Sequence, residues 1–114
     1  RRVGPSKAES YFLRLKELTS DREKGAFLLK TAHFNLLIMA WGKSDVPGAY
    51  NRIKELVDEM LKLSALGYDV FPDEFSSRWI INAANAENKI IDAMSLLEDL
   101  RKKKTKRNPN QQNK

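Results

Sequence analysis

The chain has 114 residues, of which 41% are hydrophobic and 32% charged, so it forms at most one ordinary domain with a small core. It has no cysteine, which excludes disulfides and thiolate metal ligands, and no apolar run long enough for a membrane span. The net charge is +6, but seven of the 21 Lys and Arg residues lie in the acid-free segment 101–114, which leaves 14 basic against 15 acidic residues elsewhere.

Five amphipathic segments predict five helices and no strand. They span about residues 7–18, 32–42, 49–66, 74–86 and 89–104. Thr31 and Asp73 are expected to cap the second and fourth helices. Pro47-Gly48 and Pro72 interrupt the pattern between helices, and residues 19–30 form a connection. Residues 101–114 are expected to form a basic, disordered C-terminal tail.

Each predicted helix has an apolar face that should be buried. In chain order the faces are Tyr11, Phe12, Leu15 and Leu18; Phe34, Leu37, Ile38 and Trp41; Ile53, Leu56, Val57, Met60 and Leu63; Ile80, Ile81, Ala83 and Ala84; and Ile90, Ala93, Met94, Leu96, Leu97 and Leu100.

These apolar faces recur along the chain. The face beginning at Ala8 matches that at Ile53 after 45 positions and that at Ala93 after a further 40. The pair Leu37-Ile38 matches Ile80-Ile81 after 43 positions. We therefore predict a half repeat at 6–18 and full helical hairpins at about 32–73 and 74–100, stacked as an α-α superhelix, or solenoid. Two and a half repeats are few for independent stability, so we expect the chain to continue or to be held by a partner.

The best hairpin contains FNLLIMAWGKS, then AYNRIKELVDEM, then Gly67 and Pro72-Asp73. In this order these motifs resemble the pentatricopeptide repeat family. The Trp41–Ser44 turn, the Pro47-Gly48-Ala49 entry and the loop from Gly67 to Asp73 are similar to the elongated repeats of algal organellar members. The resemblance covers about residues 32–100.

The resemblance implies a solenoid that binds single-stranded or ribosomal RNA in a mitochondrion, or alternatively a plastid. The family's base-reading places fall on Leu36, on Trp79 and on Glu74 after Pro72-Asp73. Asn35 and Arg78 stand beside the reading places, and each could contact RNA or bond within its hairpin. Trp79 could stack on a base or pack between helices.

The run RKKKTKR is the strongest electrostatic feature, because six positive charges in seven residues can neutralise several phosphates. We expect it to contact the RNA backbone through Arg101, Lys102, Lys103, Lys104, Lys106 and Arg107. The alternative is a solvated helix end without a ligand.

Nothing in the sequence has the spacing of a catalytic set, a phosphate loop or a metal site, and His33 is the single histidine. We therefore expect no enzyme activity, no cofactor and no small-molecule substrate. The predicted function is non-catalytic association with RNA in an organellar ribonucleoprotein, such as a mitochondrial ribosome, beside other protein subunits. The alternative is a helical-repeat scaffold that binds protein, which the near-neutral body and Leu36, a side chain unable to hydrogen-bond a base, both favour.

Overall fold

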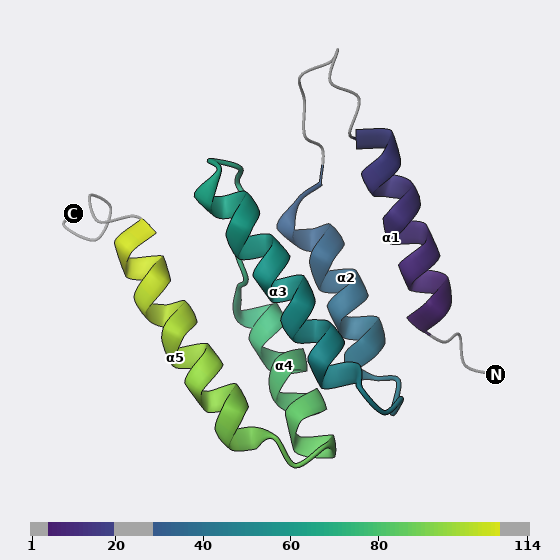
Figure 1. Ribbon diagram of the computed structural model, residues 1–114, viewed down its shortest axis with the longest axis vertical. Coiled ribbons are helices and arrows are strands. Elements are labelled where there is room, and N and C mark those ends of the chain that lie inside the picture. The colour runs from purple at the N-terminus through teal and green to yellow at the C-terminus, as the bar shows by residue number, and fades with distance from the viewer. Residues whose placement is uncertain (1–4, 20–28, 108–114) are drawn as a thin grey trace.

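The computed structural model describes residues 5–19 and 29–107, and in these ranges the chain is all-helical (Figure 1). The five helices are α1 (Pro5–Thr19), α2 (Thr31–Gly42), α3 (Ala49–Ala65), α4 (Glu74–Ala86) and α5 (Ile90–Arg107). The predicted all-α class is confirmed, and each helix lies within three residues of the predicted ends.

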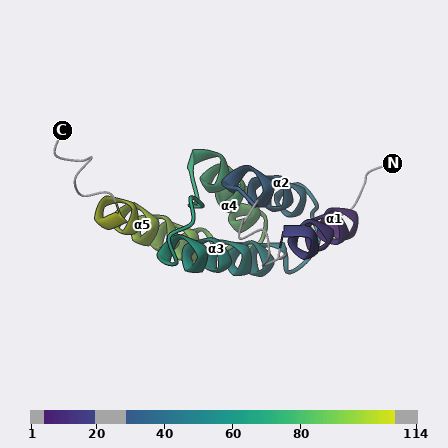
Figure 2. The same ribbon diagram turned by 90° about the horizontal axis from the view of Figure 1, so that it is seen from above.

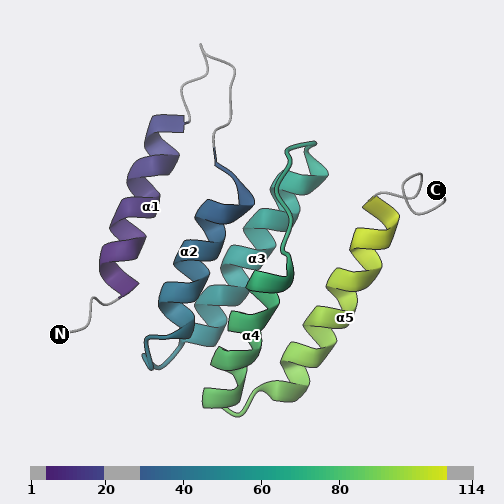
Figure 3. The ribbon, with the colours of Figure 1, turned by 180° about the vertical axis from the view of Figure 1, so that it is seen from behind.

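The helices lie in two layers. Figure 2 shows α2 and α4 in one layer and α1, α3 and α5 in the other. Helix α2 packs against α1, α3 and α4, and α4 packs against α3 and α5. The principal extents are 41 × 36 × 18 Å, and the shortest corresponds to about two helix diameters of 10 Å. The view from behind shows α2 beside α1 and α4 beside α5 (Figure 3).

The core lies between the layers and receives a buried apolar side chain from every helix. Phe12 of α1 meets Phe34 of α2 edge to face, with ring centroids 4.9 Å apart. Ile53, Ile80 and Ala93 from the other three helices have no exposed surface. These are members of the predicted apolar faces, so the helical periodicity identified the centre of the core correctly.

Ion pairs join neighbouring helices of the layer formed by α1, α3 and α5, here called the outer layer, at matching positions. Arg52 of α3 pairs with Glu9 of α1 at 2.5 Å, and Lys54 of α3 pairs with Asp92 of α5 at 3.0 Å. Glu9 and Lys54 are 45 positions apart, and Arg52 and Asp92 are 40 apart. These are the separations at which the apolar faces recur, so α3 lies against α1 in the same register as α5 lies against α3. The acidic residue comes from the earlier helix in the first pair and from the later helix in the second.

The predicted cap is right for α4 and wrong for α2. The Asp73 carboxylate accepts the Ser76 backbone N–H at 3.1 Å, and the Ser76 hydroxyl accepts the Asp73 N–H at 3.0 Å. Thr31 instead exchanges hydrogen bonds with the backbone of Phe71 in the loop before α4. At the start of α2 the Lys30 N–H is satisfied by His33 Nδ1 at 2.9 Å.

Some residues predicted to be buried lie at the edges of the layers. Tyr11 is 76% exposed and Leu18 is 66% exposed on α1, while Met94 is 59% exposed on α5 and Ile81 40% exposed on α4. For α1 and α5 the reason is positional, because these two end helices have neighbouring helices on one side only (Figure 1). An apolar stripe read from the sequence does not reveal which half of it faces a neighbour.

Helix α5 also corrects the predicted tail. It continues to Arg107, so the first half of the segment expected to be disordered is helical. None of the described helices combines the length and apolar character needed to cross a bilayer.

Candidate functional site

The C-terminal turns of α5 present the basic run. Arg101, Lys102, Lys103, Lys104 and Lys106 are all exposed, and Arg107 is the last residue of the helix. At 100° per residue, Lys102, Lys103 and Lys106 fall within an arc of about 100°, and Arg101 and Lys104 fall on the opposite side. The helix therefore divides the basic run into two faces.

The face with Arg101 is partly neutralised within the helix. Arg101 Nη2 donates to Glu98 Oε2 at 2.6 Å, and this hydrogen bond lowers the pKa of the Glu98 carboxyl. Both side chains are well exposed, so the pair adds little to stability. The face with Lys103 and Lys106 points into a groove instead.

The groove lies between the C-terminal halves of α3 and α5, which run in the same direction in the outer layer (Figure 1). We call it the α3–α5 groove. Its volume is about 780 Å³, and it is lined by Asp58, Leu61, Lys62, Ser64, Ala65, Phe71, Lys103 and Lys106. The apolar side chains come from α3 and the following loop, and the three ammonium groups outnumber the single carboxylate. The site is therefore an apolar groove with net positive charge.

Asn35 does not lie at a ligand-accessible surface. Its side chain is 6% exposed, its Nδ2 donates to Asp73 Oδ1 at 3.0 Å, and its Oδ1 accepts the Ser76 hydroxyl. Of the two roles predicted from the sequence, the structure places Asn35 in hydrogen bonds within the protein, where it joins α2 to the start of α4. Burial opposes ionisation of Asp73, but the hydrogen bonds from Ser76 and Asn35 outweigh it and lower the pKa of Asp73.

Trp79 lies in the contact between α2 and α4. A Cβ added to Gly42 would come within 2.8 Å of Trp79 Cε3, so the indole occupies the space that a side chain at Gly42 would need. Its Nε1 is enclosed without a hydrogen-bond partner among the described residues. This placement corresponds to the packing role predicted for Trp79 rather than to base stacking. Arg78 is exposed on the same helix.

The other places implied by the family resemblance are at the surface. Leu36 is 59% exposed on α2, and Glu74 is exposed at the first turn of α4. The Leu36 side chain has no hydrogen-bonding group for a base edge, and the Glu74 carboxylate repels phosphate. Arg78 is the exposed donor beside these two places.

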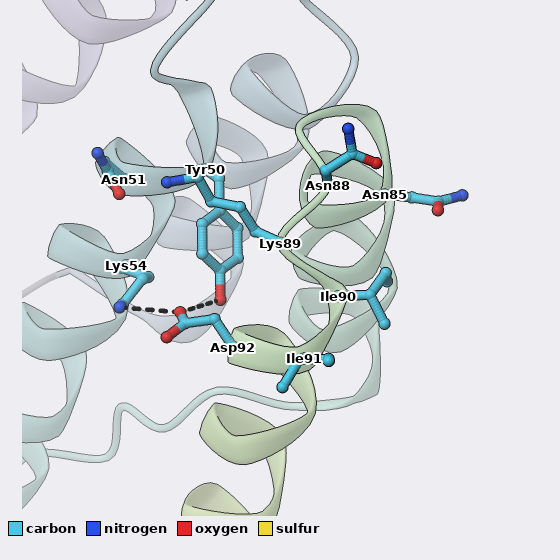
Figure 4. Close-up of a pocket in the computed structure, with 9 residues that line it drawn as sticks. All are labelled: Tyr50, Asn51, Lys54, Asn85, Asn88, Lys89, Ile90, Ile91 and Asp92. Carbon is cyan, nitrogen blue, oxygen red and sulfur yellow. Dashed lines mark hydrogen bonds and ion pairs between the residues drawn. The ribbon is translucent and has the colours of Figure 1, made fainter.

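A second hollow, of about 540 Å³, opens where α3 meets the turn between α4 and α5 (Figure 4). There the Tyr50 hydroxyl donates to Asp92 Oδ2 at 2.7 Å, and Lys54 Nζ contacts the same oxygen at 3.0 Å. Burial, and then the Asp92 carboxylate, raise the pKa of Tyr50. Figure 4 shows these three side chains turned toward one another, so they satisfy each other and join α3 to α5.

Among the residues that the structure describes, no three His, Asp or Glu side chains gather in a way that could hold a metal ion. Comparison of the chain with protein-family models, with curated proteins and with solved structures finds no match.

Lys103 and Lys106, which line the groove, were among the basic residues predicted to contact RNA, but the groove itself was not predicted. Leu61, Lys62 and Ala65 share one side of α3 at helical spacing, which is a usable signal. That this side lies opposite Lys103 and Lys106 depends on how α3 and α5 are placed side by side, which no local pattern encodes.

Proposed function

We propose that this protein is a non-catalytic RNA-associated segment of an α-solenoid, of pentatricopeptide type, in an organellar ribonucleoprotein such as a mitochondrial ribosome. The single observation that carries the RNA part is the exposed helical basic run of α5, set on a body with almost no net charge. The solenoid part is supported by the alternation of helices between two layers and by the recurrence of the interhelical ion pairs at 45 and 40 positions (Figure 2).

The mode of binding follows from the geometry. Phosphates are drawn to the lysines, and release of their counterions drives association without dependence on base sequence. The two faces of α5 limit how many charges one strand can meet. A strand lying along the face with Lys102, Lys103 and Lys106 makes about three phosphate contacts, which predicts a slope of about −2 for log K against log salt.

The test is fluorescence anisotropy with a labelled single-stranded RNA of mixed sequence, titrated with the intact protein over a salt series. Changing Lys102, Lys103 and Lys106 to Gln should weaken binding about 100-fold at 0.1 M salt, since each lost contact costs about fivefold there. The control changes Lys7, Arg14 and Lys43 to Gln, which removes the same charge from other exposed sites. Equal weakening by both sets, or no binding by the unmodified protein, would refute the proposed contact.

A protein-binding scaffold is the second candidate, and a specific observation favours it. Tyr11 on α1 and Ile91 on α5 are 76% and 86% exposed at opposite edges of the layers. Exposed apolar side chains at such edges suit contact with further helices. If RNA binding fails at all salt concentrations, this function becomes the better one.

A further inference from the structure

The α3–α5 groove contains apolar residues that contacts with phosphate alone would not require. Its apolar lining residues, here called its floor, are Leu61, Ala65 and Phe71, which come from α3 and the loop that follows it. A purely electrostatic site has no need of an apolar floor, because phosphates gain nothing from it. A ligand that fits the groove therefore combines an apolar surface with negative charge.

The charges around this floor are predominantly positive. Lys62 stands on the α3 side, Lys103 and Lys106 stand on the α5 side, and Asp58 is the opposing charge. Two of these lysines also belong to the basic run, so the groove is continuous with the rest of the positive surface. A chain of regularly spaced negative charges that passes along α5 thus enters the groove directly.

The volume agrees with a ligand of limited size. At about 780 Å³ the groove falls in the range of about 300–1,000 Å³ that is typical of sites for small organic groups. A nucleotide has an apolar base face and an anionic phosphate linked by a few bonds. Every base offers such a face, which makes contact with an apolar floor tolerant of sequence.

We propose that the α3–α5 groove is a nucleotide-binding site for single-stranded RNA, in which a base lies against Leu61, Ala65 and Phe71 while Lys62, Lys103 and Lys106 hold the adjacent phosphates. This inference rests on the proposed RNA association and adds to it a location and a base contact. It differs from recognition by the hairpin positions Leu36 and Trp79, which lie on α2 and α4 in the other layer (Figure 2).

An acidic peptide is the competing occupant, since it also combines carboxylates with apolar groups. RNA is favoured by charge density, because it carries one negative charge at every unit of its chain and the basic surface extends beyond the groove along α5. The two occupants are separated by the experiment below.

The experiment compares two double variants of the intact protein that remove equal charge from one helix end. K103Q/K106Q removes the lysines that line the groove, and R101Q/K104Q removes the two basic residues on the opposite face of α5. All four positions are exposed and Gln is a good helix former, so circular dichroism should show the helical fold unchanged. The probes are a labelled 12-nucleotide RNA and an abasic ribose-phosphate strand of the same length.

We expect K103Q/K106Q to weaken RNA binding about 25-fold at 0.1 M salt and to reduce the salt slope by about 1.4, with less than threefold weakening by R101Q/K104Q. The abasic strand should bind the unmodified protein at least fivefold more weakly than the RNA, because stacking of a base on an aromatic side chain such as Phe71 is worth about 1–3 kcal/mol.

Equal losses in the two double variants, or equal affinity for the abasic strand, would overturn the groove site while leaving RNA association intact. Absence of RNA binding by the unmodified protein at low salt would instead overturn the proposed function and the groove site together. Tighter binding of an acidic amphipathic peptide than of RNA, lost in K103Q/K106Q, would show that the occupant is protein.

Discussion

Replacing Asn35 by Ala tests whether this residue supports the fold or reads RNA. The substitution removes two hydrogen bonds from a side chain that is 6% exposed, one to the Asp73 carboxylate and one from the Ser76 hydroxyl. A buried bond to a charged group contributes about 1.5–3 kcal/mol and a neutral one about 0.5–1.5 kcal/mol. Alanine regains about 0.5 kcal/mol of helix propensity. The expected loss in the free energy of unfolding is therefore about 1.5–4 kcal/mol.

Urea denaturation followed by circular dichroism measures this loss. The control is Asn51→Ala, which makes the same chemical change at an exposed position inside α3 and should alter stability by less than about 0.5 kcal/mol. In the folded state Asn35→Ala should bind RNA as the unmodified protein does. Stabilities of the two variants within about 0.5 kcal/mol of each other, combined with weaker RNA binding by Asn35→Ala, would refute the structural role assigned to Asn35.

Three further perturbations test the contacts between helices. Glu9→Gln should lower the free energy of unfolding by about 1 kcal/mol at pH 7. Because the hydrogen bond from Arg52 lowers the pKa of Glu9 below its ordinary 4.5, the denaturation curves of variant and parent should converge as the pH falls through that lowered pKa. Gly42→Ala should destabilise the protein by about 1 kcal/mol, although alanine has the better helix propensity, because the added Cβ meets the Trp79 ring. Calorimetry should show a smaller loss when Gly42→Ala is made in a Trp79→Leu background. In an ultraviolet titration, one of the three tyrosines should ionise later than the others, and this late step should be missing in Tyr50→Phe.

Ionisation of Tyr50 should also make the free energy of unfolding decrease at alkaline pH. Since the pKa of Tyr50 is raised in the folded protein, its contribution is complete below the ordinary value of 10 and declines as the pH rises above it. Retention of full stability well above pH 10, with all tyrosines ionised together, would contradict the burial assigned to this hydroxyl.

The sequence by itself determined the five described helices, with their ends placed to within three residues. Apolar residues at helical spacing, the breakers Pro47-Gly48 and Pro72, and the cap at Asp73 are local features that act through the neighbouring few residues. It also determined where the positive charge lies, because the run from residue 101 onward has no acidic residue to offset it.

Tertiary structure decided which of these residues can meet a ligand. Asn35 is polar and close to a predicted reading position, yet packing of α2 on the start of α4 encloses it. Tyr11 is apolar on a predicted buried face, yet the edge of the layer exposes it. Lys62 and Lys103 are about 40 residues apart and face one groove only because α3 and α5 lie side by side. Burial and proximity of this kind arise from long-range packing, whereas periodicity and capping are encoded within single turns.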